Sequence, residues 1–137
     1  MVARGSGNGQ RTGPLIGIGI DLVEIDRMRE LLDRRGDAFV TKVFAIDERL
    51  SLSSPKAPAH YAARFAAKEA FMKALGTGLA QGIRWHDVAV VRAPSGAPGL
   101  RLEGAARDLS DAMGVGRVHL SLTHSRQTAA AVVVLES

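Results

Sequence analysis

Acidic and basic residues stand among apolar ones in the segment "RFAAKEAFMKALGTG", residues 64–78. The segment is rich in Ala, Phe, Met and Leu and has no β-branched residue before its final Gly-Thr-Gly, which favours a helix. At about 100° per residue, Glu69 and Lys73 share one narrow stripe with Ala62 and Ala66. An exposed i,i+4 ion pair and a binding site both fit these two charges. A solvated stripe usually holds more polar residues, so the alanines indicate that something packs there.

The same helix carries a pair of like charges and ends on two glycines. Arg64 and Lys68 are four residues apart, which costs stability unless an anion or an acidic group lies between them. Gly76 and Gly78 fit a helix C-cap with a turn, and they also fit a loop that binds phosphate. A structural role and an anion-binding role are both open.

A carboxylate follows an alternating segment near the start of the chain. "LIGIGID", residues 15–21, predicts a strand with Gly17, Gly19 and Asp21 on one face and isoleucines on the other. Two missing side chains leave the backbone open to close approach by a ligand or another chain. Asp21 is then a carboxylate at a strand end, beside a groove. Asp21 and Glu24 also match a helix capping box with Asp21 as N-cap, and the two roles are compatible.

These residues are sufficient for a metal–phosphate site. Mg²⁺ needs only one or two carboxylates when substrate phosphates and waters complete its coordination shell. Asp21 and Glu69 supply the carboxylates if the fold brings them together, and Lys73 can contact the same phosphates as a point charge.

The sequence lacks the residues that several other kinds of binding or catalytic site require. "GIGID" has Leu22 where the dinucleotide-binding fingerprint needs its third glycine, and no G-x-S-x-G elbow presents a serine nucleophile. The chain has no cysteine, which excludes disulfides, thiolate catalysis and zinc–thiolate sites. His60, His86 and His119 show no metal-ligand spacing. His124 ends an alternating strand, and this position fits both a solvated histidine and a histidine that contacts a ligand.

A basic face precedes these elements. Arg27, Leu31 and Arg34 recur at i, i+4 and i+7, with Arg35 beside them, and this face suits an acidic helix with an apolar centre. Acidic residues balance the charge across the predicted helix, at Glu24, Asp26, Glu30 and Asp33. A docking face and a solvated face both fit this pattern.

The elements that must position these residues alternate in type. We expect strands at 15–21, 83–94, 100–104, 117–124 and 128–137, and helices at 22–35, 59–75 and 105–114, with short helical pieces over 37–52. The last two strands should form an antiparallel hairpin, because only three residues join them. This order predicts an α+β domain in which a mixed, mainly antiparallel sheet packs against a long central helix.

Length and composition place the chain among globular proteins. Its 137 residues suit one domain, over 14–137, after a flexible tail of residues 1–13 that lacks the apolar core of a secretion signal. Apolar residues make up 46% and the net charge is +4, which permits an anionic substrate or an acidic partner. No apolar run is long enough for a transmembrane helix, and the few aromatic residues argue against single-stranded nucleic acid. The absence of cysteine fits a reducing cytoplasm.

Three segments in this order resemble a known family. "GIGIDLVEIDRM", "RFAAKEAFMKALGTG" and "SLTHSRQTAAAVVV" are similar to the holo-acyl-carrier-protein synthases, the short type of 4′-phosphopantetheinyl transferase. The resemblance covers nearly the whole chain outside the tail. It implies transfer of 4′-phosphopantetheine from coenzyme A to a serine of an apo acyl carrier protein, leaving adenosine 3′,5′-bisphosphate.

The resemblance also implies roles for single residues. Asp21 and Glu69 match the family's two metal carboxylates for Mg²⁺, with Mn²⁺ as an alternative, and Lys73 matches its lysine at the diphosphate. Together these three are the candidate catalytic residues. The candidate coenzyme A contacts are Arg64, Lys73, Gly76 and His124, with Arg64 near the 3′-phosphate and His124 at the nucleotide.

The basic face falls where the family docks its carrier protein, which assigns Arg27, Leu31, Arg34 and Arg35 to that partner. Short members of the family form trimers with each site shared between two protomers. The chain departs from the family at Ser125, where many members carry an acid that follows the strand-end histidine. Loop 53–58 also aligns poorly, so Lys56 takes no assigned role. We expect Glu69 or a metal-bound water to be the general base.

Two rival functions stay open. A non-catalytic basic module that docks an acidic protein explains the arginine face but not two carboxylates beside a glycine face. Another Mg²⁺-dependent nucleotide enzyme, such as a hydrolase of diphosphates, explains the carboxylates but not the resemblance.

Overall fold

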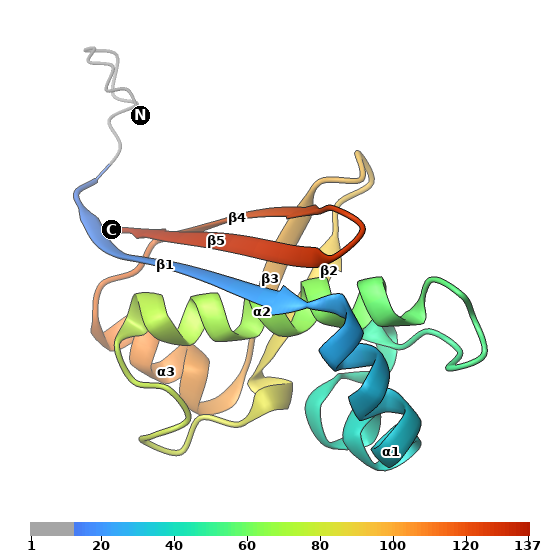
Figure 1. Ribbon diagram of the computed structural model, residues 1–137. Helices are drawn as coiled ribbons and strands as arrows, with labels where there is room; N and C mark the ends of the chain where they lie inside the picture. The colour runs from blue at the N-terminus through green and yellow to red at the C-terminus, as the bar shows by residue number, and fades with distance from the viewer. Residues whose placement is uncertain (1–12) are drawn as a thin grey trace.

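The computed structural model describes residues 13–137, and a long helix lies at its centre (Figure 1). This helix, α2 (Ala57–Leu75), packs on a three-stranded antiparallel sheet. The strand order in the sheet is β1 (Leu15–Glu24), β5 (Thr128–Glu136) and β4 (Arg117–His124). The predicted α+β fold, mainly antiparallel around a long central helix, is confirmed. Residues 1–12 of the predicted tail lie outside the described part of the chain.

The remaining elements surround α2 on its other sides (Figure 1). They are α1 (Ile25–Val43), the short 3₁₀ segments η1 (Ile46–Glu48) and η2 (Trp85–Asp87), the antiparallel pair β2 (Val88–Arg92) and β3 (Pro98–Leu102), and α3 (Gly104–Ala112). We expected one sheet, but the strands form two antiparallel sheets, one of three strands and one of two. None of the described helices is both long enough and apolar enough to span a membrane.

The glycines of β1 serve the packing of α2. A Cβ added at Gly17 would lie 2.0 Å from the carbonyl oxygen of Ala74, and one at Gly19 would lie 2.0 Å from that of Ala70. The glycine face, predicted to be open to a ligand or another chain, is covered by the backbone of α2. Asp21 shares this face and therefore also points toward α2.

The capping role predicted for Asp21 is wrong. Pairing with β5 extends β1 to Glu24, so Asp21 lies opposite Ala131 inside the strand and the helix begins at Ile25. The helix expected over 22–35 does end at Gly36, whose non-helical φ 48° and ψ −125° separate it from a second helical segment, and the two together make up α1. A positive φ is accessible to glycine without steric cost, so the helix can change direction there.

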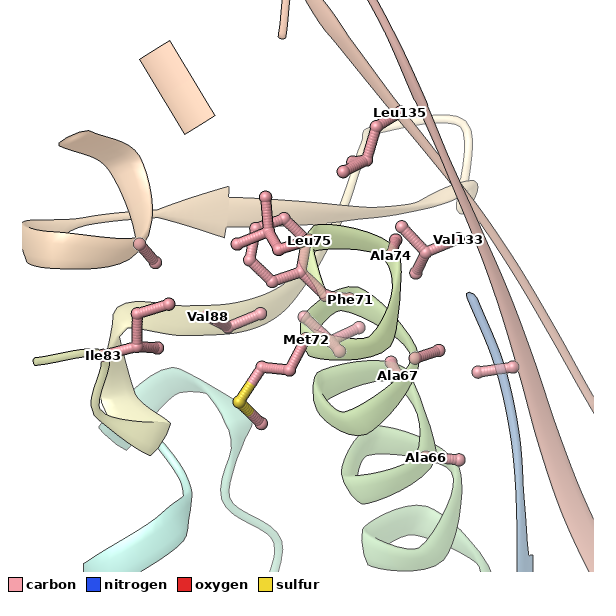
Figure 2. Packing of buried hydrophobic residues seen from close by; sticks show 14 residues of the cluster. Ala66, Ala67, Phe71, Met72, Ala74, Leu75, Ile83, Val88, Val133 and Leu135 are labelled. Carbon is pink, nitrogen blue, oxygen red and sulfur yellow. The ribbon is translucent and has the colours of Figure 1, made fainter. Parts of the chain in front are cut away.

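Two clusters of buried apolar residues form the core, one on each half of α2. The larger cluster joins α2 to β5, β2 and α3, and Figure 2 shows Val133 and Leu135 of β5 beside Ala74, Phe71 and Leu75 of α2. The smaller cluster joins the start of α2 to α1. The helix is therefore buried on several sides, which fixes the positions of the polar residues that it carries.

The outer face of the three-stranded sheet is apolar along β1 and β5 and polar along β4, where His119, Ser121 and Thr123 are exposed. Ile18, Ile20 and Leu22 of β1 are 65%, 60% and 65% exposed. Their partners on β5 are Val134, Val132 and Ala130. No described element covers this face, which leaves an apolar surface of the kind found at interfaces between proteins.

Candidate active site

An ion pair joins β1 to α2 at the edge of the glycine packing. Lys73 Nζ lies 2.9 Å from Asp21 Oδ1 and 3.1 Å from the carbonyl oxygen of Ile20, and it donates a hydrogen bond to each. The Asp21 side chain is 13% exposed, whereas that of Lys73 is 56% exposed. The Asp21 hydrogen bond, and then the Asp21 charge, raise the pKa of Lys73. Strand and helix therefore hold opposite charges together at the mouth of a cavity.

The second oxygen of Asp21 is available to a ligand. Asp21 Oδ2 is buried and accepts no hydrogen bond from residues 13–137. A buried carboxylate oxygen without a partner is costly, and a cation removes that cost.

Glu69 lies close enough to Asp21 for their charges to interact. Burial, and then the charge of Asp21, raise the pKa of Glu69, while Lys73 opposes the shift. A carboxylate whose charged form is disfavoured by burial and by a neighbouring carboxylate is a favourable place for a divalent cation. We call Asp21, Glu69 and Lys73 the metal corner.

The donor set of the metal corner fits Mg²⁺. Within the described part of the chain, no group of three or more His, Cys, Asp or Glu residues could enclose a metal ion. Two carboxylates with an unpartnered oxygen match the way Mg²⁺ is bound when substrate phosphates and waters supply the remaining ligands. Mn²⁺ accepts the same hard oxygen donors.

A cavity of about 440 Å³ opens from the metal corner toward α1. Its lining includes Asp21 and Glu69 together with Arg27, Leu31 and Arg34 of α1. The structure thus brings three of the four predicted docking residues to the cavity that holds both carboxylates. An acidic helix bound on α1 would lie beside the metal corner.

A second cavity, of about 690 Å³, has five basic residues in a lining that is otherwise mostly apolar. They come from the start of α2, the end of β2 and the end of β4, and they are Lys56, His60, Arg64, Arg92 and His124. We call this the basic cavity. It brings together the predicted residues Arg64 and His124, and it adds His60 and Arg92, which the sequence interpretation missed. Lys56, left without a role above, lies there too.

The basic cavity has the electrostatics of an anion site. Arg64 Nε is buried and finds no acceptor among the described residues. Burial, and then the charge of Arg92, lower the pKa of Arg64, and burial is also the main cause that lowers the pKa of His60. A bound phosphate would stabilise the charged form of the partly buried Arg64.

Comparison with known proteins places the chain in a family. Residues 17–133 match the profile of the 4′-phosphopantetheinyl transferase superfamily. The chain is 51% identical over 123 residues to the holo-[acyl-carrier-protein] synthase of Maridesulfovibrio salexigens, covering 89% of this chain and 98% of that protein. The chain belongs to the holo-acyl-carrier-protein synthases of this superfamily. It is therefore a phosphopantetheinyl transferase, as the sequence motifs predicted.

Solved structures of holo-acyl-carrier-protein synthases share the fold. The crystal structure from Neisseria meningitidis superposes with a TM-score of 0.83 at 32% identity, covering 90% of this chain and all of that one (100%). The Bacillus anthracis enzyme in complex with coenzyme A (3′,5′-ADP) superposes with a TM-score of 0.72 at 34% identity, covering 90% of this chain and 97% of that one. The arrangement of α2 on the sheet is thus that of the family.

The alanine stripe of α2 is covered, as the sequence predicted. Ala62 and Ala66 are both fully buried. Figure 2 shows Ala66 on the side of α2 that faces the strands. Something does pack on the stripe, and it is the sheet, so the space beside Glu69 is the cavity toward α1 and not the alanine side of the helix. Small residues there let the helix approach the strands closely.

The remaining candidate residues are placed as follows. Gly76 is a left-handed C-cap of α2, with φ 81° and its N–H donating to Met72 O at 2.9 Å, which confirms the cap. Its contact with coenzyme A stays a prediction of the family resemblance. Arg35 lines a separate cavity of about 240 Å³ with Phe39, Lys42 and Trp85, next to the cavity of the metal corner. The like-charged pair on α2 is relieved because Lys68 turns inward to Glu48.

Proposed function

We propose that this chain transfers 4′-phosphopantetheine from coenzyme A to a serine of an apo acyl carrier protein, and that the metal corner carries out the transfer. The observation that supports this site most directly is the buried, unpartnered Oδ2 of Asp21 beside the carboxylate of Glu69. The products are holo acyl carrier protein and adenosine 3′,5′-bisphosphate. Fatty acid synthesis uses the holo form, and the cytoplasm is the expected location.

In the proposed mechanism Asp21 and Glu69 hold Mg²⁺ at the diphosphate of coenzyme A. The metal ion supplies charge neutralisation on the diphosphate oxygens when it is bound. Lys73 binds Asp21 in the free protein, and its side chain is 56% exposed, so the ammonium would serve as a second positive group for the diphosphate.

The group transfer is a displacement at phosphorus. The serine oxygen of the carrier protein forms a bond to the β-phosphorus, and the bond from that phosphorus to the bridging oxygen breaks. The electron pair leaves with adenosine 3′,5′-bisphosphate. Glu69 or a metal-bound water would accept the serine proton, because the serine is assigned beside the carboxylate pair.

The nucleotide of coenzyme A is assigned to the basic cavity of a neighbouring protomer. Among the described residues, none lines both the basic cavity and the cavity of the metal corner. A single chain therefore offers two half-sites that open separately. The exposed apolar face of Ile18, Ile20 and Leu22 supports association of copies, and a homotrimer, as in short family members, would let each half-site meet its complement.

The carrier protein is assigned to the α1 side of the metal corner. An acidic carrier protein would pair with Arg27 and Arg34 on either side of the apolar Leu31, although Glu24 and Glu30 line the same cavity. A serine at the start of an acidic helix docked there would lie next to Glu69. This surface needs no contact with nucleic acid or with a membrane.

Mass spectrometry of an apo acyl carrier protein mixed with coenzyme A, Mg²⁺ and this chain tests the proposal. We expect the carrier protein to gain the mass of one phosphopantetheine group, and to gain nothing when EDTA replaces Mg²⁺. An unchanged carrier mass with coenzyme A intact would favour a non-catalytic docking module. An unchanged carrier mass with coenzyme A cleaved would favour a Mg²⁺-dependent hydrolase.

A further inference from the structure

A buried ion pair lies on the side of α2 that faces away from the three-stranded sheet. Lys68 Nζ is 2.7 Å from Glu48 Oε1, and both side chains are fully buried. The Lys68 ammonium also lies 5.3 Å from the centre of the Phe44 ring. Lys68 directly precedes Glu69 in the chain, and the transfer mechanism proposed above gives it no role.

The pair belongs to a hydrogen-bond network in which every charge has partners. Lys68 Nζ also donates to the carbonyl oxygens of Val88, at 2.5 Å, and Trp85, at 3.2 Å. Glu48 accepts from the N–H of Ala45 through Oε1 and from that of Val90 through Oε2, each at 2.9 Å. One lysine therefore joins α2 to η1, to η2 and to β2.

The position of this network around α2 is what links it to the metal corner. At about 100° per residue, Lys68 lies about 200° from Ala66 and about 100° from Glu69. The alanine side of α2 rests on the strands, and the Lys68 side is held by the network. Contacts on two opposite sides prevent the helix from rotating about its axis, and such a rotation would move Glu69 relative to Asp21.

We propose that Lys68, paired with Glu48, is a positioning residue that fixes the rotation of α2 so that Glu69 and Lys73 face Asp21. The inference rests on the function proposed above, because it concerns the same metal corner. Stability alone does not require an ion pair here, since well-packed apolar residues often replace such pairs without loss. Burial in fact lowers the pKa of Lys68, against the opposing charge of Glu48, so the charged form is held at a cost.

The test uses a double variant, Glu48→Gln with Lys68→Met. Lys68→Met alone would leave the Glu48 carboxylate buried without its partner and would unfold the chain for that reason. The double variant removes both charges and keeps an amide oxygen as acceptor at position 48. Binding of Mn²⁺ in the presence of coenzyme A is measured by electron paramagnetic resonance, together with the melting temperature, kcat and the KM for the carrier protein.

We expect the double variant to fold cooperatively and to bind Mn²⁺ about tenfold more weakly, or worse, with a similar loss of kcat, as is usual when groups that orient metal ligands are removed. The KM for the carrier protein should not change, because Arg27 and Leu31 lie outside the network. Ile83→Ala is the matched control, since Ile83 is buried in the core on the same side of α2. It should lower the melting temperature and leave the Mn²⁺ affinity unchanged.

The other possible outcomes would each contradict either the positioning role of Lys68 or the proposed function. Mn²⁺ affinity and kcat of the double variant within about twofold of wild type would overturn the positioning role, because removed orienting groups should cost more. A double variant that does not fold would overturn it as well, since the pair would then serve folding rather than position. Wild-type protein that binds no Mn²⁺ with coenzyme A present would instead overturn the proposed function.

Discussion

At the scale of single residues, the metal corner is a conflict of charges that a cation would resolve. Lys73 neutralises one oxygen of Asp21 and leaves the other buried without a partner among the described residues. Glu69 is partly buried beside it, and its pKa is raised. In the free protein the negative charges of Asp21 and Glu69 are therefore incompletely compensated, at the place where the mechanism needs a metal.

Glu69→Gln tests that conflict. Because folding raises the pKa of Glu69 above 4.5, the folded state binds more protons than the unfolded state above that pH, and stability falls as pH rises through this window. Without metal, the variant should lose this pH dependence and melt at a higher temperature than wild type at about pH 7.

With Mg²⁺ and coenzyme A present, wild type should instead melt at a higher temperature than Glu69→Gln. Ligand binding should stabilise wild type and not the variant. Transfer to the carrier protein should fall by about 100-fold or more, the usual effect of losing a general base. Melting curves with EDTA and with Mg²⁺ check both parts. Equal stabilisation of the two proteins by Mg²⁺ would remove Glu69 from the site.

A separate prediction concerns Arg64 in the basic cavity. If its unpartnered Nε and guanidinium bind the 3′-phosphate of coenzyme A, Arg64→Gln should raise the KM for coenzyme A by about tenfold, a typical loss for one charge-assisted contact. Dephospho-coenzyme A, which lacks that phosphate, should show nearly the same KM with both proteins. Parallel losses for the two donors would place Arg64 elsewhere on the substrate.

At the scale of elements, α2 and β1 position the site through an unusually close contact of backbones. Gly19→Ala should destabilise the chain by about 3 kcal/mol or more, because the new Cβ would lie 2.0 Å from Ala70 O, a backbone atom that cannot turn away. Gly99→Ala in β3 is the matched control, since no heavy atom of the described residues lies within 4 Å of its added Cβ. Urea unfolding of both variants measures the difference. A Gly19→Ala protein as stable as Gly99→Ala would mean that the strand and helix are farther apart.

Structural features whose cause lies within a short segment could be predicted from the sequence, and features that depend on distant segments could not. Strict alternation in 117–124 and the three-residue turn after it are local, and the β4–β5 hairpin was predicted correctly. Asp21 was misread as a helix cap because the length of β1 depends on pairing with β5, more than one hundred residues later. The sequence predicted that something packs on the alanine stripe but did not identify the sheet, since periodicity does not say what covers a face.

The candidate site shows the same division. Asp21, Glu69 and Lys73 were singled out by residue type and spacing, and the fold does bring them together. Arg92 was not, and Lys68 was noted only as a like-charged neighbour of Arg64, because the partners of each come from distant elements. A buried lysine in the middle of a helix gives no signal in the sequence beyond its charge.

At the scale of the whole molecule, association through the apolar face of the sheet is the step that would complete each site. Ile20→Glu should abolish trimers and transfer activity together, because it places a charge in the centre of that face. Ile46→Glu is the control, since Ile46 is 81% exposed on η1 and away from the sheet. Sedimentation and the transfer assay should show wild-type behaviour for the control. A monomeric Ile20→Glu protein with full activity would place the whole site within one chain.

The most direct test of the account is activity in mixed assemblies of two inactive chains. One chain carries Glu69→Gln, which removes the metal corner, and the other carries Arg64→Glu, which removes the basic cavity. The two are coexpressed with different affinity tags and purified by both tags in turn. If each site joins the metal corner of one protomer to the basic cavity of the next, a mixed trimer keeps one intact site and should transfer at about one third of the wild-type rate. Mixed assemblies that are no more active than either parent would contradict a site shared between protomers.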